Sequence, residues 1–536
     1  GKFDYWPGPI DDNTGEPVVN GCENFDRIWK VQRSDVQLLI SDFEEDGVVD
    51  QPVPASLLSW PGKGNPHFES LMNFVLPNQN LAPFFDRDSN GIYEPLNGEY
   101  PVLDPAIPDI LPDELLWCVF NDLQNEHEQS GGQPLGIEVQ LLVYAFNCEE
   151  SPVLNHSVFT KHIITNKSND SLSDVYAGFW VDGLVGCLWD DFFGCDTLLN
   201  TVYYYGGDDT DGLNGCDCPF GALNLPTFCY HHPVQAVTLL NHTMDYLTYH
   251  ESFFSFCDPA IPTFGPQVDT QFYNFLTGRW NDGTRFTYGG YGYNPGSTDF
   301  VNYAFFDNPN TPGGWSMYNG NTFVCDKQVI LSSKVEDFLP EDALTLDMVY
   351  SFYRVPGASH LENVDEALAR IPELQNFYNN DFNTGCTQLQ VCQSDCVWPG
   401  DADNSGFVRN DDLLYTAVGS ANFQTGSPRA VVSYAWLPQE AIPWSDTFQN
   451  GANFKHADCN GDGQIDTLDF GLIDYNYRLH VPGIEETEEP SALIEGQLYA
   501  DIHRDTVSVT DFQVLKKFVR INLELGTETQ PFQDVR

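Results

Sequence analysis

Two acidic stretches near the C-terminal end repeat one spacing of oxygen-bearing residues. A calcium ion takes roughly six to eight oxygen ligands, and a short loop supplies them from side chains at positions 1, 3, 5 and 12 and from the carbonyl at position 7, with glycine at position 6. In order, the five ligand residues are Asp401, Asp403, Ser405, Phe407 and Asp412 in the first stretch and Asp458, Asn460, Asp462, Gln464 and Asp469 in the second. Because both stretches match at every position, the spacing predicts one calcium ion in each.

Two further stretches near the N-terminal end carry related patterns. One has oxygen at every ligand position and predicts another calcium site, with the carbonyl of Ile92 at position 7 and the side chains of Asp86, Asp88, Asn90, Glu94 and Asn97. The other is incomplete, because Val53 stands at its position 12, and it would use Asp42, Glu44, Asp46 and Asp50. The pattern therefore predicts calcium at two loops, with one or more additional sites upstream.

Each of the two C-terminal loops leads into a helical pattern. Apolar residues continue after the first loop from Leu413 and after the second from Phe470, whereas the stretch before each loop contains proline or histidine. This loop–helix arrangement, with Asp at position 12, resembles the type I dockerin module. The resemblance implies calcium binding through the loop residues given above. It does not imply docking onto a separate scaffold, because Asn410-Asp411 and Thr467-Leu468 stand where such modules carry a Ser-Thr pair.

Composition limits the partners that this chain can have. The net charge of the 536 residues is −55, from 23 basic and 78 acidic side chains. Such a charge repels nucleic acid and anionic membranes, so neither binding nucleic acid nor inserting into a membrane is expected. Calcium ligation, adaptation to a saline medium and plain solubility are three explanations of the acidity that the sequence leaves open.

Cysteine usage indicates an exported protein. The 14 cysteines form no C-x-x-C pair, and together with calcium loops they favour disulfides over a metal cluster. No apolar run is long enough for a membrane-spanning helix, and the start at Gly1 is expected of a mature or trimmed product. We therefore expect an extracellular or cell-surface location.

The middle of the chain predicts a mainly β fold. Short runs rich in β-branched and aromatic residues alternate with turn residues, which is typical of an antiparallel β-sandwich. Helices are expected at 33–41 and at 362–371, the second ended by Pro372. The predicted domains are a β-rich, disulfide- and calcium-stabilised region at 1–395 with a loop-rich part at 206–320, a dockerin-like module at 396–482 with an insertion at 420–455, and an acidic linker followed by the first strands of a cohesin-like sandwich at 483–536.

The order of several loop motifs resembles large secreted multidomain proteins of Bacteroidota that are cargo of the type IX secretion system. The motifs are Trp6-Pro7-Gly8-Pro9, Trp60-Pro61-Gly62-Lys63-Gly64-Asn65-Pro66, Phe85-Asp86-Arg87-Asp88-Ser89-Asn90-Gly91 and Cys396-Val397-Trp398-Pro399-Gly400-Asp401. This resemblance implies a secreted surface protein and attaches no enzymatic activity to the chain.

Catalytic motifs are absent from the sequence. It contains no G-x-S-x-G, H-E-x-x-H or phosphate loop, and the histidine set His231, His232, His242 and His250 fits a structural role better than a metal site. A string of acids set among aromatics at 182–211 predicts buried carboxylates that need partners such as a cation. We predict a calcium-stabilised structural or adhesive surface protein, or one that forms filaments, without catalysis. It would contact itself or neighbouring domains of its own chain, or surface glycans. The alternative is a secreted carbohydrate-active enzyme or carbohydrate-binding protein with an appended dockerin-like module.

Overall fold

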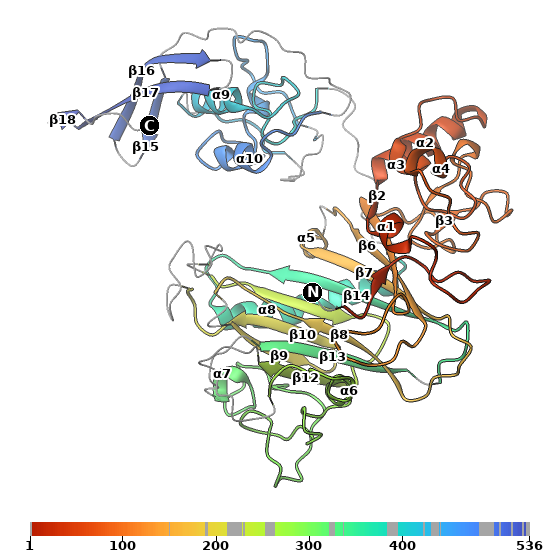
Figure 1. Ribbon diagram of the computed structural model, residues 1–536. Coiled ribbons are helices and arrows are strands. Elements are labelled where there is room, and N and C mark those ends of the chain that lie inside the picture. The colour runs from red at the N-terminus through yellow and green to blue at the C-terminus, as the bar shows by residue number, and fades with distance from the viewer. Residues whose placement is uncertain are drawn as a thin grey trace. The chain divides into compact units, whose positions relative to one another are not determined.

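The computed structural model divides the chain into two compact units, Gly1–Gly385 and Cys386–Arg536, which are described separately (Figure 1). The predicted domain boundary at 395/396 falls just inside the second unit. The structure describes residues 3–148, 151–187, 191–211, 228, 231–251, 263–320, 327–335, 337–382, 395–421, 424–429, 439 and 441–481, and the backbone of residues 498–502, 505–515, 518–527 and 530–531.

Unit 1 is built on a nine-stranded antiparallel sheet. Its strand order is β1-β5-β6-β7-β14-β11-β10-β9, and β2 also pairs with β5. The strands are β1 (Trp6–Pro7), β2 (Trp29–Gln32), β5 (Glu114–Asn121), β6 (Ile137–Ala145), β7 (Ser157–Asn166), β9 (Asp191–Asp196), β10 (Thr201–Gly206), β11 (Val234–Leu239) and β14 (Ala343–Tyr353). Over the chain, strand (26%) exceeds helix (21%), which confirms the prediction of a mainly β, antiparallel fold.

A three-stranded sheet packs against the large one. Its order is β12-β13-β8, formed by β8 (Val175–Val181), β12 (Tyr246–Glu251) and β13 (Lys327–Val335). Aromatic side chains fill the space between the sheets, with Phe193 of β9 and Tyr249 of β12 at a ring-centroid distance of 5.4 Å. The hydroxyl of Tyr204 in β10 donates to the carbonyl of Val181 in β8 at 2.9 Å. The two sheets therefore form a sandwich-like core.

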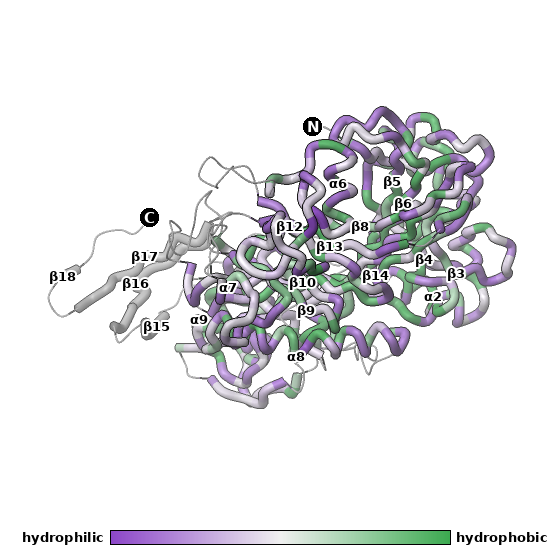
Figure 2. Tube along the Cα trace, turned by 90° about the horizontal axis from the view of Figure 1, so that it is seen from below, coloured by the Kyte–Doolittle hydropathy of each residue, from purple (hydrophilic) through white to green (hydrophobic). Residues whose placement is uncertain are grey.

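Helix α8 (His360–Asn379) covers part of the large sheet. It begins with a capping box at Ser359, and Phe377 packs on Phe159 of β7 at a centroid distance of 6.0 Å. Apolar and polar stretches alternate along it, as an amphipathic helix requires (Figure 2). The prediction that Pro372 ends the helix is wrong. The turns beyond the proline bury Leu374 and Phe377, and this burial stabilises them in helical form.

Replacing Pro372 with alanine is expected to stabilise unit 1 by about 1–3 kcal/mol, because proline inside a helix removes one backbone hydrogen bond and clashes with the preceding turn. Pro372 is exposed, so the substitution removes no core contact. Urea unfolding of the intact protein measures the gain. Glu373→Ala, next along the exposed face, is the matched control and should change stability by less than about 1 kcal/mol. An unchanged or lower midpoint for Pro372→Ala would contradict the prediction.

The N-terminal part adds short helices and a small hairpin to unit 1. These elements are α1 (Gly21–Phe25), α2 (Arg33–Asp46), α3 (Ala55–Leu58), α4 (Phe68–Met72), β3 (Phe84–Phe85), η1 (Pro95–Asn97) and β4 (Tyr100–Pro101). The predicted helix at 33–41 is confirmed as α2 but continues further. The remaining helices of unit 1 are α5 (Pro152–Asn155), α6 (Asp269–Leu276) and α7 (Met317–Gly320). The loop-rich part at 206–320 contributes β11 and β12 to the two sheets.

Unit 2 holds α9 (Asn410–Ala421), η3 (Phe454–His456) and α10 (Asp469–Tyr475). Both helices begin where the sequence predicts them, at the end of an acidic loop. Four antiparallel strands follow in the order β15-β16-β17-β18, namely β15 (Leu498–Ile502), β16 (Asp505–Leu515), β17 (Phe518–Thr527) and β18 (Gln530–Pro531).

Candidate metal centre

The first acidic loop brings three carboxylates together ahead of α9. Asp401, Asp403 and Asp412 each offer an oxygen within 4.8 Å of the others. Asp401 Oδ2 accepts from Gly406 N at 2.9 Å, and Asp412 Oδ2 accepts from Arg409 N at 2.7 Å. These bonds fold the backbone around the carboxylates, so position 12 returns to position 1 as a calcium loop requires.

The second loop repeats these backbone hydrogen bonds with its own residues. Asp458 Oδ2 accepts from Gly463 N at 3.1 Å, and Asp469 Oδ2 accepts from Asp466 N at 2.8 Å. Each bond joins the same two loop positions as in the first loop. The glycine at position 6 has a positive φ in both, 84° at Gly406 and 86° at Gly463, which a side chain would strain.

The two loops are tied to each other by crossed backbone pairing. Phe407, at position 7 of the first loop, bridges His480 beyond α10, while Gln464, at position 7 of the second, bridges Thr425 beyond α9. Each loop therefore pairs with the segment that follows the helix of the other. This exchange makes the two loops one folded module with approximate twofold symmetry.

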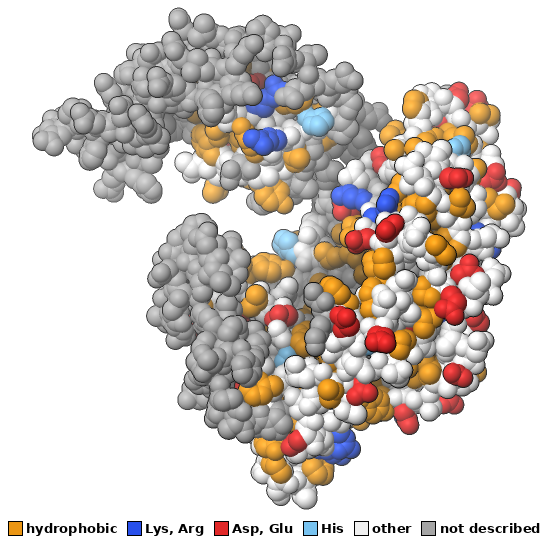
Figure 3. Space-filling model, in the orientation of Figure 1, with side chains coloured by type: hydrophobic (Ala, Val, Ile, Leu, Met, Phe, Trp, Pro, Cys, Tyr) orange, Lys and Arg blue, Asp and Glu red, His pale blue; other side chains and the backbone are white. Residues whose placement is uncertain are grey.

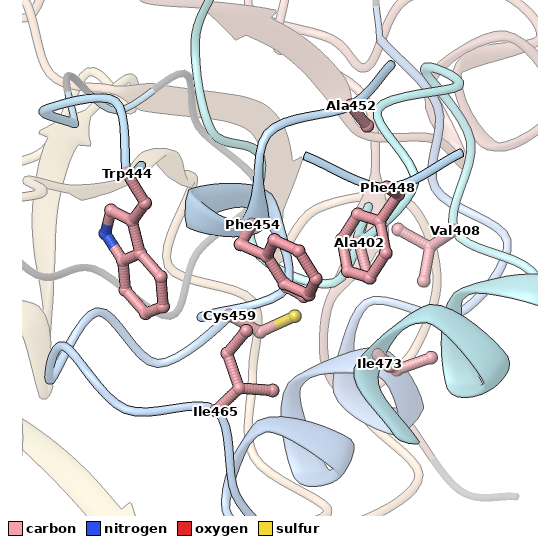
Figure 4. Close-up of a cluster of buried hydrophobic side chains, with 10 residues drawn as sticks. Ala402, Val408, Trp444, Phe448, Ala452, Phe454, Cys459, Ile465 and Ile473 are labelled. Atoms are coloured by element: carbon pink, nitrogen blue, oxygen red, sulfur yellow. The ribbon is translucent and has the colours of Figure 1, made fainter. Parts of the chain in front are cut away.

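The loop core consists of the residues that point away from the carboxylates. Position 2 of each loop, Ala402 and Cys459, is fully buried, and position 8, Val408 and Ile465, is buried too. They pack with aromatic residues from 442–454, including Trp444 and the pair Phe448 and Phe454 (Figure 4). Of the apolar residues in the insertion at 420–455, Ile442 is exposed, whereas Trp444 and Phe448 are buried in this core. Trp436 and Leu437 lie outside the described residues.

Burial and mutual repulsion make the loop carboxyl groups hard to ionise without a cation. Loss of water first, and the charge of Asp403 next, raise the pKa of Asp401 to about 7 and that of Asp412 well above its usual value. In the second loop, burial raises the pKa of Asp458 to about 6 and that of Asp469 to about 7. A divalent cation offsets this cost, so the arrangement suits a metal.

A third loop in unit 1 adopts the same turn at 86–99. Gly91 N donates to Asp86 Oδ2 at 2.8 Å, which is the bond from position 6 to position 1 seen in unit 2. The backbone nitrogen of Glu94, at position 9, donates to Glu99 Oε2 at 2.7 Å, just as position 9 donates to position 12 in the other loops. Glu99 is buried and converges with Asp86 and Asp88 within 4.8 Å.

Glu99 therefore takes the place that the sequence pattern gave to Asn97. Asn97 ends the short helix η1 and is exposed, so its predicted role at position 12 is wrong. The helix adds two residues to the loop, which a fixed count of positions overlooks. The sequence does contain a sign that Glu99 belongs to the loop, because this acid directly follows a glycine. That glycine, Gly98, has a φ of 77°.

The incomplete stretch at 42–53 is not a loop. Asp42, Glu44 and Asp46 lie in the last turns of α2, and Asp42 Oδ2 accepts from the backbone nitrogens of Asp50 and Gln51 at 2.9 and 3.1 Å. Helical residues two apart point in different directions. The predicted calcium loop here is wrong, because the helix continues past 41.

A cavity of about 420 Å³ adjoins the third loop. The side chain of Arg87 lies over the ring of Phe43 at 4.3 Å, and two partly exposed apolar residues, Val48 and Leu96, line the opening. The cavity also exposes atoms of Asp88 and Glu99 to its interior. The cavity is thus lined by the aromatic ring of Phe43, the cation of Arg87 and two of the three converging carboxylates.

The acids at 182–211 do not gather around one point. Asp211 pairs with His232 at 2.6 Å with both side chains fully buried, and Asp209 pairs with His360 at 2.8 Å. Among the described residues, only the groups at Asp86 and Asp401 bring three acidic, histidine or cysteine ligands together. The predicted buried carboxylates are present, but histidines and backbone groups are their partners, and Asp190 lies outside the described residues.

The described cysteines include both disulfide-bonded and free ones. Cys148, Cys187 and Cys396 are disulfide-bonded, whereas Cys22, Cys118, Cys195 and Cys459 are free. The thiol of Cys459 lies in the loop core and contacts the carbonyl of His456 at 3.7 Å. Whether most of the 14 cysteines are paired stays a prediction.

On the face of unit 1 drawn in Figure 3, acidic side chains are scattered among uncharged and apolar ones, and basic side chains are few. None of the helices in the described ranges combines the length and apolarity that a membrane crossing requires.

No family model matches this chain, and no curated protein matches it. Its function is therefore inferred from the geometry of its own residues.

Proposed function

We propose that the protein is a non-catalytic, calcium-stabilised structural or adhesive protein of the cell exterior, with the paired loops of unit 2 as a calcium-dependent joint. The crossed pairing of the loops at 401–412 and 458–469 carries this proposal. It makes the fold of the whole module depend on the converging carboxylates of the first loop and on the matching acids of the second loop, which would bind Ca²⁺ through hard oxygen ligands. The loop–helix arrangement keeps its resemblance to type I dockerins, but here it serves neighbouring domains or other copies of the chain.

The position of the downstream strands supports a joint. In unit 2, the backbone of β15 lies beside α9, so the strands that we propose to be cohesin-like lie against the proposed calcium module. A short linker holds such partners at about millimolar effective concentration, so even a weak contact stays closed within the chain or passes to the next copy. Calcium then sets the stiffness of the connection.

Small-angle scattering of the full-length protein tests the joint. With calcium, we expect a single compact arrangement of the module and the strands that follow it. With chelator, the maximum dimension should grow as the loops unfold. Particle imaging under the same two conditions reports whether copies associate into filaments. The same flexible profile in both conditions would refute the joint.

The cavity beside the 86–99 loop favours a second candidate function, recognition of surface glycans. A calcium ion at a cavity edge can accept sugar hydroxyls as ligands, while the ring of Phe43 offers an apolar face and Arg87 offers hydrogen-bond donors. This assigns carbohydrate binding, not hydrolysis, to unit 1. Calcium-dependent retention of the intact protein on a glycan array distinguishes it from a purely structural role.

Glu99→Gln is expected to weaken calcium binding at the third loop by at least about tenfold, because it removes one of three carboxylates from the ion. Asn97→Ala should leave the affinity within about twofold, since Asn97 is exposed and Glu99 holds its place. Titration calorimetry of the two full-length variants measures both effects. A greater loss from Asn97→Ala than from Glu99→Gln would restore the original position-12 assignment.

A further inference from the structure

A buried arginine from the insertion lies against the second calcium loop. Arg429 is 6% exposed. Its backbone nitrogen donates to the carbonyl of Gly461 at 2.9 Å, and its Nη2 donates to the carbonyl of Cys459 at 2.7 Å. A Cβ at Gly461 would lie 2.6 Å from Arg429 Nε. The guanidinium thus rests directly on the loop backbone, where only glycine leaves room for it.

The remaining polar atoms of this guanidinium have no hydrogen-bond partner. Nε and Nη1 of Arg429 are buried and unpaired. No carboxylate among the described residues reaches ion-pair distance of it, so its charge acts on the loop through space. Burial lowers the pKa of Arg429, and the charges of Asp458, Asp469 and Asp462 oppose that effect. Because the guanidinium of arginine stays protonated in proteins, a positive charge is held beside the ligand carboxylates of this loop.

Carboxylate number does not distinguish the two loops. The first has Asp401, Asp403 and Asp412, and the second has Asp458, Asp462 and Asp469. Each set holds three acids at ligand positions. The first loop's own arginine, Arg409, stacks on the ring of Phe407 at 4.1 Å, and its charge opposes the raised pKa of Asp411, which is not one of the ligand residues. A buried arginine on the loop backbone is thus a feature of the second loop, in addition to a difference in spacing, since the three carboxylates of the first loop converge within 4.8 Å and those of the second do not.

We infer that Arg429 is a built-in counter-charge that makes the two calcium sites unequal, with a tight site in the first loop and a weaker, later-filling site in the second. The inference rests on the proposed calcium binding of unit 2. A fixed cation relieves the repulsion among carboxylates in the empty loop and repels the divalent ion in the filled loop. Both effects lower the affinity for calcium, which depends on the net charge of the ligand set. The joint would then stiffen in two stages as calcium rises.

The test is a calcium titration of the full-length protein by calorimetry, in a Glu99→Gln background that silences the third loop. Wild-type unit 2 should show two separate steps. Arg429→Gln is expected to tighten the weaker step by about ten- to a hundredfold and to leave the tight step unchanged. Arg429→Lys keeps the charge and is the matched control, with both steps retained. If Arg429→Gln leaves the second step unchanged or weakens it, the inference is overturned.

A second pair of variants keeps the test decisive should Arg429→Gln fail to fold. Asp401→Asn should abolish the tight step and Asp458→Asn the weak one, with Arg429 in place. The opposite assignment, or two steps of equal affinity in the unaltered loops, would overturn the inference. Absence of any calcium uptake by unit 2 is a different result, because it would refute the proposed function itself.

Discussion

Chelating calcium from the intact protein is expected to unfold residues 400–480 while the two sheets of unit 1 stay folded. The carboxylates of Asp401, Asp403 and Asp412 converge within 4.8 Å, so without a cation they repel one another inside a buried site. An ion present at a thousand times its Kd stabilises the folded state by about 4.1 kcal/mol. In a module of this size, losing that amount lowers Tm by on the order of 20 °C.

Hydrogen exchange with and without chelator measures this unfolding segment by segment. Amides of α9 and α10 should lose protection, and those of β7 and β14 should keep it. Asp412→Asn in calcium is the matched variant, because it keeps the shape of the side chain and removes the charge that closes the first loop. This variant should reproduce part of the loss of amide protection in α9 and α10. Full protection of α9 after chelation would show that the module folds without calcium.

How far sequence alone predicts this molecule depends on whether the interacting residues are close in the chain. The loops at 401–412 and 458–469 contain their own ligands and their own glycine, so a fixed spacing finds them, and the helices that follow are found with them. The same counting fails at 86–99, where η1 inserts a turn and moves the acid from Asn97 to Glu99. It fails again at Asp42, because an acidic string with the right spacing is equally compatible with the end of a helix.

Contacts between distant segments were not predictable from spacing. The crossing of the loops, in which Phe407 meets His480 and Gln464 meets Thr425, depends on how two helices pack. Arg429 lies in an insertion whose sequence gives no sign that it folds back onto the second loop. Similarly, the acids at 182–211 were expected to need a cation, and strand pairing instead brings histidines to them. Asp211 and His232 meet because β10 and β11 are neighbours in the sheet.

Replacing His232 with leucine is expected to destabilise unit 1 by about 3–5 kcal/mol, because it leaves the carboxylate of Asp211 buried without its charged partner. The two side chains are fully buried and 2.6 Å apart, and Asp211 also accepts from the backbone nitrogen of Phe228. Urea unfolding of the full-length protein measures the loss. Adding Asp211→Asn to the leucine variant should recover part of it, since the uncompensated charge is then gone.

The pair between His360 and Asp209 provides the control, because it has the same chemistry in a wetter place. Asp209 is 58% exposed, so His360→Leu should cost only about 0–1 kcal/mol through the pair itself.

The pH dependence of stability gives an independent check on the charge of His232. Burial lowers the pKa of His232, but the hydrogen bond and charge of Asp211 outweigh it and raise the pKa above its usual value. A raised folded-state pKa means that the stabilisation is full below about pH 6.5, the pKa of an unfolded histidine, and is lost as pH rises through the folded value. The wild-type protein should therefore lose stability above that pH relative to the leucine variant, and parallel pH profiles for the two proteins would show that His232 is not charged in the folded state.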